Sequence, residues 1–242
     1  MTRMSDGRYA PAGSLIGMVQ RGRGLGARMV AEDPRGAAEV VAGCVRWDWR
    51  WDDADQRAVY LARLLRDAGV EAAPLAPVPG GRRHETHGAG EAAEGDVEAL
   101  VERLEREWVE RRWCGPVHTA RALAGFGVRA RGAASLLRRF WLWTPHSHER
   151  VGYLEALAVI EPAGLDGIYL ECLWDCEEDA RLLGVERAPD GAQVRERLRY
   201  LERDELEGEA VRAAARERLL RCRSARGERV RGEGRERARV GG

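Results

Sequence analysis

Apolar residues that recur 34 positions apart constrain the fold of this chain more than any other feature. The matched positions are Val117 with Val151, Leu123 with Leu157, Leu136 with Leu170, and Phe140 with Trp174. Within each block the apolar spacing predicts a helix, a tight turn and a second helix. A helix pair of this length cannot bury its apolar face alone, so the repetition predicts an α-solenoid in which neighbouring pairs stack.

The helical period continues on the C-terminal side of these blocks. It predicts a helix over residues 178–188, a turn at Pro189-Asp190-Gly191, and a following helix that buries Val194, Leu198 and Leu201. A last helix is predicted over residues 209–222, where Val211, Ala214, Ala215, Arg218 and Leu219 recur at helical spacing. Alternating patterns typical of strands are rare, so we expect an all-α protein.

Three more helices are predicted nearer the N-terminus. Asp33 is a candidate N-cap, followed by Pro34, for a helix that buries Ala37, Val40, Val41, Cys44 and Val45. A second helix, capped by Asp52 or Asp53 and ended by Gly69, is predicted to bury Ala58, Leu61, Leu64, Leu65 and Ala68. A third begins after Asp96 and ends before Cys114-Gly115-Pro116.

Several predicted second helices open with valine followed by arginine. The openings are Val128-Arg129-Ala130, Val194-Arg195-Glu196 and Val211-Arg212-Ala213-Ala214-Ala215, the first of them after Ala122-Leu123-Ala124 and a short turn. This pattern resembles HEAT repeats and their shorter relatives in the bilin-lyase HEAT-like group, over roughly residues 116–220 and more weakly over 33–69. The resemblance implies an α-α superhelix of helical hairpins and says little about activity.

Composition divides the chain into four parts. We expect a helical region over residues 1–70, a Pro/Gly-rich linker or loop over 71–95, the repeats over 96–223, and a disordered Arg/Gly/Glu tail over 224–242. From Arg212 onward the chain carries eleven Arg against four Glu, so the tail could add a weak, salt-sensitive attraction to nucleic acid. The interspersed Glu residues favour a merely solvated tail.

The charged residues exclude some chemistry outright. All 40 basic residues are Arg, they balance 40 acidic residues, and no Lys is present, which excludes a catalytic Lys, a Schiff base and a Walker-type phosphate clamp. The five Cys are scattered without a C-x-x-C pair, so we expect reduced core thiols. No apolar stretch approaches the roughly 20 residues of a membrane span and no secretory signal is present, which predicts a cytoplasmic protein without membrane contact.

The most distinctive candidate site is a tryptophan cluster near the N-terminus. Trp47, Trp49 and Trp51 fall within five residues, and Trp is a favoured anchor of protein interfaces. The alternative is that these rings fill the corner between two helices, because Trp is usually much buried. With Arg129, Arg131, Arg195 and Arg199 on the predicted inner helices, they form our predicted partner-binding set.

Other local patterns favour structural roles. The segment from Arg138 to His146 mixes two Arg with aromatic residues, which fits a nucleic-acid track less well than a helix end with buried rings. The acidic turn from Trp174 to Asp179 could be a docking point for a basic partner or an ordinary helix start. Neither His pair nor any Cys pair supplies the ligands of a zinc site, so no metal or cofactor is expected. The glycines between Gly22 and Gly26 lack the dinucleotide-binding spacing.

These observations favour a non-catalytic protein-interaction or scaffold module whose partner the sequence does not identify. One alternative is a nucleic-acid-binding solenoid similar to the HEAT-like DNA glycosylases, and a weaker one is a bilin-lyase-type enzyme that rests on fold resemblance alone. A continuous Arg-lined surface would favour nucleic acid, whereas alternating acidic and basic side chains would favour a protein partner.

Overall fold

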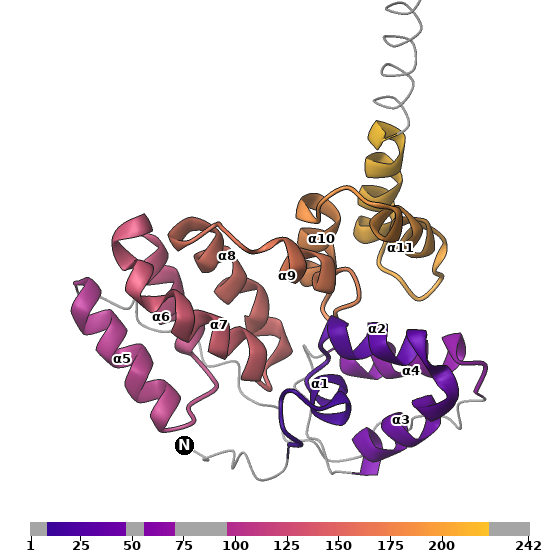
Figure 1. Cartoon of the computed structure of the whole chain (residues 1–242), viewed down its shortest axis with the longest axis horizontal. Helices are drawn as coiled ribbons and strands as arrows, with labels where there is room; N and C mark the ends of the chain where they lie inside the picture. The colour runs from indigo at the N-terminus through magenta and orange to yellow at the C-terminus, as the bar shows by residue number, and fades with distance from the viewer. Residues whose placement is uncertain (1–8, 47–55, 71–95, 223–242) are drawn as a thin grey trace, which may run out of the picture.

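The computed structural model describes residues 9–46, 56–70 and 96–222. Throughout these ranges the ordered elements are helices, and no strand occurs in them, which confirms the predicted all-α class (Figure 1). None of the described helices has the length and apolar character that a bilayer span requires.

The N-terminal helices pack around a small core of their own. They are α1 (Leu15–Gln20), α2 (Gly24–Glu32), the 3-10 turn η2 (Pro34–Gly36), α3 (Ala37–Arg46) and α4 (Arg57–Asp67). The buried residues of this core include Val19, Val30, Val41, Tyr60 and Leu61. The helices predicted after Asp33 and before Gly69 are therefore present, whereas α1 and α2 were not predicted from the sequence.

Two local signals act as predicted and one position differs. Asp33 accepts a hydrogen bond from the Arg35 backbone N–H before α3. Gly69 (φ 67°) ends α4, and Val70 donates to the Leu65 carbonyl as in a Schellman motif. Ala58, predicted to be buried, is exposed, because the inward stripe of α4 runs through Tyr60 instead. Asp52 and Asp53 lie outside the described residues.

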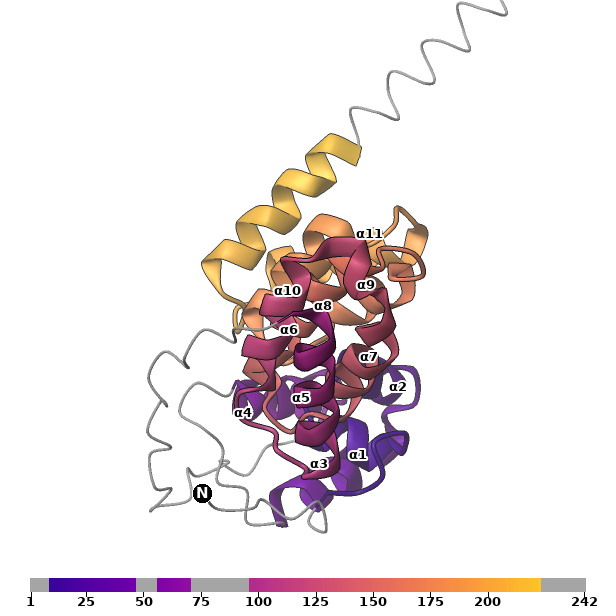
Figure 2. The same cartoon turned by 90° about the vertical axis from the view of Figure 1, so that its left-hand side faces the viewer.

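Both repeat blocks are helical at the predicted positions. The first consists of α6 (Pro116–Ala124), η3 (Gly127–Ala133) and α7 (Ala134–Trp143); the second of η4 (Ser147–Glu149), α8 (Arg150–Ile160) and α9 (Asp166–Cys172). Helices α6 and α8 begin 34 residues apart, and α8 packs against both α6 and α7 (Figures 1 and 2). The second helix of the first block does not begin regularly at Val128, because a 3-10 segment with a kink at Ala130 precedes α7.

The flanking helices extend the same arrangement. Helix α5 (Val97–Val109), N-capped by the Asp96 side chain, packs on α6. Helices α10 (Glu178–Arg187) and α11 (Ala192–Arg203) lie at the positions predicted for the third pair, with Val194, Leu198 and Leu201 buried. A final helix spans residues 209–222 and buries Val211, Ala215 and Leu219.

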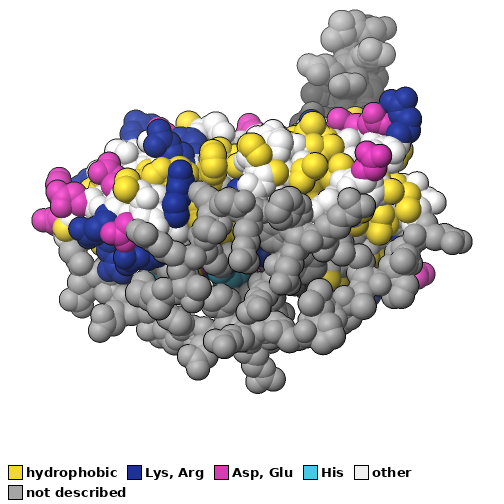
Figure 3. Space-filling view, turned by 90° about the horizontal axis from the view of Figure 1, so that it is seen from below, with side chains coloured by type: hydrophobic (Ala, Val, Ile, Leu, Met, Phe, Trp, Pro, Cys, Tyr) yellow, Lys and Arg dark blue, Asp and Glu magenta, His cyan; other side chains and the backbone are white. Residues whose placement is uncertain are grey.

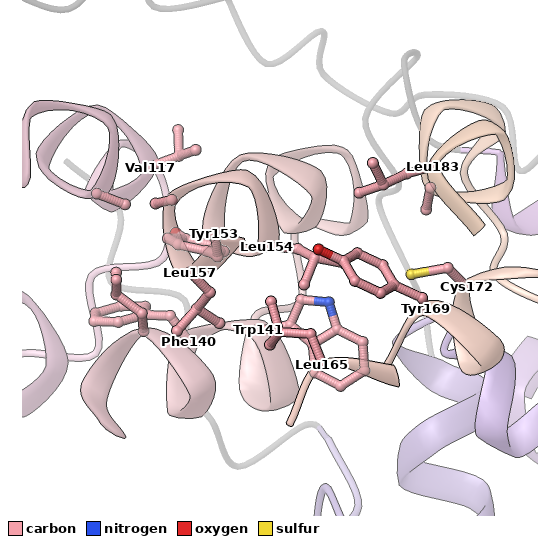
Figure 4. Packing of buried hydrophobic residues seen from close by; sticks show 14 of the residues in the cluster. Val117, Phe140, Trp141, Tyr153, Leu154, Leu157, Leu165, Tyr169, Cys172 and Leu183 are labelled. Atoms are coloured by element: carbon pink, nitrogen blue, oxygen red, sulfur yellow. The ribbon is translucent and has the colours of Figure 1, made fainter. Parts of the chain in front are cut away.

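A single larger core runs from α5 to the final helix. Figure 4 shows its centre, where Phe140 and Tyr153 stack with ring centroids 5.5 Å apart beside Leu157. The aromatic residues of the 138–146 segment are part of it, since Phe140 and Trp141 are buried. In Figure 1, α1 to α4 lie beneath α9 to α11, and α5 to α8 lie to one side; the two cores meet where α2 contacts α9.

Candidate functional site

The glycines between α1 and α2 form a close seam with the end of α9. Gly22 adopts φ 65°, and its carbonyl accepts a hydrogen bond from the Cys176 backbone N–H at 2.9 Å. A Cβ atom at Gly24 would lie 2.0 Å from the Glu171 carbonyl oxygen. This glycine segment, whose spacing does not match a dinucleotide-binding motif, is therefore a packing surface. At Gly24 the close approach leaves no room for a side chain larger than hydrogen.

One buried ion pair crosses this seam, and a second lies beside it. Arg23 donates two hydrogen bonds to the Glu171 carboxylate, at 3.0 and 2.9 Å, and its guanidinium lies 5.0 Å from the Trp141 ring centroid. Arg150 donates to Asp175 at 3.0 Å and also to the Arg21 backbone carbonyl. The Arg150 and Asp175 side chains are at most 1% exposed, so each charge depends on the other.

The acidic turn after α9 is occupied by groups of the chain itself. Glu177 accepts hydrogen bonds from the Ser147 hydroxyl at 2.5 Å and from the Gln56 backbone N–H at 3.5 Å. Asp175 and Glu177 are both buried. The turn was considered as a docking point for a basic partner. In the structure Arg150 of the same chain pairs with Asp175, and Glu177 contacts Gln56 and Ser147, so the turn makes intramolecular contacts.

A second ionic cluster joins α4 to α11 and the loop that follows it. Arg63 donates to Asp204 at 2.6 Å and to Glu207 at 3.3 Å, and Arg181 pairs with Glu207 at 2.7 Å. Arg66 contacts Asp204 at 2.6 Å from the more exposed side. Burial alone would raise the pKa of Asp204, but the hydrogen bond from Arg66 and the charge of Arg63 outweigh it and hold that pKa below its ordinary value.

Replacing Asp204 with asparagine should therefore destabilise the fold in a pH-dependent way. A carboxylate with a lowered native pKa stabilises the fold above its unfolded pKa of about 3.9, and this contribution disappears as the pH falls through the native value. We expect Asp204→Asn to lower the free energy of unfolding by about 2 kcal/mol at pH 7 and to approach the parent below pH 4, measured by urea denaturation. The Glu155→Gln variant, at an exposed position, is the control. A difference in the free energy of unfolding between Asp204→Asn and the parent that stays constant with pH contradicts the prediction.

The outer side of this cluster is an open depression on α11. Its lining residues alternate in charge and surround one aromatic ring: Arg66, Glu196, Arg199, Tyr200, Arg203, Asp204 and Glu205. Glu196, Arg199 and Arg203 are exposed and lie three and four residues apart, on one face of the helix. On the face drawn in Figure 3, acidic and basic side chains likewise lie next to each other at both ends, with hydrophobic side chains between them. We call this set of seven residues the α11 depression.

The predicted partner-binding residues fall in separate places. Trp47, Trp49 and Trp51 lie outside the described residues. Arg129 is exposed 5.2 Å from the Phe126 ring centroid, and Arg131 pairs with Glu161 at 3.3 Å.

On α11, Arg195 is half-buried and Arg199 is exposed. Arg199 is the one residue of the four predicted arginines that lines the α11 depression.

Comparison with known proteins adds nothing to this geometry. No family model, curated protein or solved structure matches the chain.

Two buried thiols, those of Cys44 and Cys172, are held in their protonated form. Burial raises the pKa of Cys44 to about 12 and raises that of Cys172 as well. A thiol with a raised pKa is a poor nucleophile and a poor metal ligand at neutral pH. Cys44, Cys172 and Cys176 are buried, as expected for core thiols, whereas Cys114 is exposed.

Sequence reasoning missed the arginines that lie at core positions of helices. Arg63 lies between the buried Tyr60 and Leu64 on α4, and Arg197 lies next to the buried Leu198 on α11. Arg63 lies three residues after Tyr60, and Arg197 lies three residues after the buried Val194 and four before Leu201, so this helical spacing was visible in the sequence. It was overlooked because charged residues were assigned to the solvent side of each helix.

Proposed function

We propose that this protein is a non-catalytic HEAT-like repeat protein that acts as a protein-interaction or scaffold module. The ordered packing of α6 with α8, α8 with α10 and α9 with α10 around one extended core supports an α-α superhelix of hairpins. Such stacked hairpins leave one side of successive helices free for a partner, and α11 has this position through Glu196, Arg199 and Arg203.

The observation that carries the proposal is the alternating charge of the α11 depression. Three arginines and three acidic residues surround Tyr200 there. A nucleic-acid backbone is bound by surfaces of uniformly positive charge, whereas mixed charges around an aromatic ring suit a protein surface of complementary pattern. The proposal therefore places the partner's charged side chains against Arg199 and its acidic neighbours.

Reversal of one charge tests this assignment. We expect Arg199→Glu to abolish capture of a protein partner that the parent retains from a cell extract, because it places a second acidic side chain beside Glu196 on this face of α11. Arg139→Glu, an equally exposed position on α7, is the matched control and should retain the partner. Both variants should unfold at the parent's temperature, since neither arginine makes an ion pair among the described residues.

Two results would contradict the proposal. One is a partner that both variants retain equally. The other is tight binding of DNA or RNA by the full chain that persists at 150 mM salt and is lost in Arg199→Glu, which would favour the nucleic-acid alternative.

A further inference from the structure

A small cavity lies between α2, α4 and α11, on the inner side of the ion pairs that join α4 to α11. Its volume is about 80 Å³. One wall is apolar and comes from α2 and α4, with Ala27, Val30 and Leu64 among its residues. The opposite side presents Trp174 and the guanidinium-bearing side chains of Arg63 and Arg197.

Arg197 differs from Arg63, the other buried arginine that lines this cavity. It is 8% exposed, and its Nε donates to the Leu173 backbone carbonyl at 3.0 Å. Its guanidinium carbon lies 4.1 Å from the Tyr200 ring centroid and 5.0 Å from that of Trp174. Among the ion pairs of residues 9–46, 56–70 and 96–222, none includes Arg197, although burial lowers its pKa only to about 10 and leaves it charged at neutral pH.

The nearby carboxylates are already engaged by other arginines. Arg63 is bound by Asp204 and Glu207. Asp67, which also lines the cavity, accepts hydrogen bonds from Arg66 on one oxygen and from the Tyr200 hydroxyl on the other. The cavity thus has an apolar wall, a buried guanidinium without an anionic partner, and an acidic neighbour whose two oxygens face other donors.

We propose that this cavity binds a carboxylate that carries one further carbon atom, with the carboxylate paired to Arg197 and the carbon atom against Ala27, Val30 and Leu64. The volume is about half of the roughly 150 Å³ cavity that holds benzene in another protein, which leaves room for three or four non-hydrogen atoms. Acetate has this size, and so has the end of an aspartate or glutamate side chain. Arginine suits the role because its planar fork binds a carboxylate through two parallel hydrogen bonds.

The test is a titration of the full chain followed by the indole N–H signals in ¹H–¹⁵N NMR spectra, with the Trp174 signal assigned by Trp174→Phe. Sodium acetate should shift the Trp174 signal saturably at constant ionic strength, and neutral acetamide should not. Arg197→Gln should weaken acetate binding at least tenfold, while Arg139→Gln, at an exposed position on α7 that lines neither the cavity nor the α11 depression, should bind as the parent does.

A second variant keeps Arg197 and blocks the space. Ala31 is exposed at the cavity lining, so Ala31→Leu fills the cavity without displacing the core, and Ala58→Leu is the control at an exposed position that does not line it. Ala31→Leu should abolish the acetate response and Ala58→Leu should retain it. This pair decides the matter if Arg197→Gln does not fold.

The source of the carboxylate is distinguished by capped peptides. A blocked Gly-Glu-Gly peptide that shifts Trp174, with no shift by Gly-Gln-Gly, supports an acidic side chain of a protein; a response to acetate alone supports a free short-chain acid. No saturable acetate response in the folded parent, or a response of equal size to acetamide, overturns the proposal.

Discussion

Replacement of Arg150 by methionine is expected to lower the free energy of unfolding by about 3–5 kcal/mol. The variant leaves the Asp175 carboxylate completely buried without its partner, and removal of one member of a buried ion pair costs about this much. It also removes the hydrogen bond to the Arg21 carbonyl, which ties the segment after α1 to α8. Urea denaturation followed by circular dichroism measures the loss.

The double variant Arg150→Met/Asp175→Leu is the control for this interpretation. Because it removes both charges, it should recover much of the stability that the single variant loses, although the Arg21 carbonyl stays without its donor. A double variant no more stable than Arg150→Met would contradict the assignment of the loss to an uncompensated charge.

Gly24→Ala is expected to have the second largest effect, a loss of about 3 kcal/mol. The new methyl group would lie 2.0 Å from the Glu171 backbone oxygen, so α2 would have to move away from α9, and overpacking of this kind costs about 1–3 kcal/mol. The displacement would also lengthen the Arg23–Glu171 pair next to it. Thermal unfolding of the purified variant measures the effect.

Gly43→Ala provides a matched control for that substitution. Gly43 lies within α3, and an added Cβ there meets nothing within 4 Å. Alanine should therefore stabilise the fold by up to about 1 kcal/mol through its higher helix propensity. A Gly24→Ala variant as stable as the parent would show that α2 does not pack against α9 as closely as described.

The apolar periodicity predicted most of the helices because each buries one stripe of side chains. The positions of Val194, Leu198 and Leu201 fix the inward face of α11, and Gly69 fixes the end of α4, from local signals alone. Helix α1 was missed because it has six residues, too few to display a period. Helix α2 was missed because glycines occupy positions where the chain approaches α9 closely, which only the tertiary structure reveals.

The buried ion pairs could not be predicted from the sequence, for a different reason. Arg150 and Asp175 are 25 residues apart, and Arg23 and Glu171 are 148 apart, so no local pattern pairs them. Arg199 was predicted as an exposed binding residue and is exposed. The sequence did not show which acidic residues surround Arg199, or that Arg66 of α4 lines the α11 depression. Both depend on the tertiary contact between Arg66 and Asp204.

The most direct test of the proposed function is hydrogen–deuterium exchange of the full chain with and without its captured protein partner. If the partner binds the α11 depression, exchange should slow in residues 196–205 and around Arg66, where the lining residues lie, and remain unchanged in α5. Protection confined to α5, α6 or α7, with none on α11, would contradict the account.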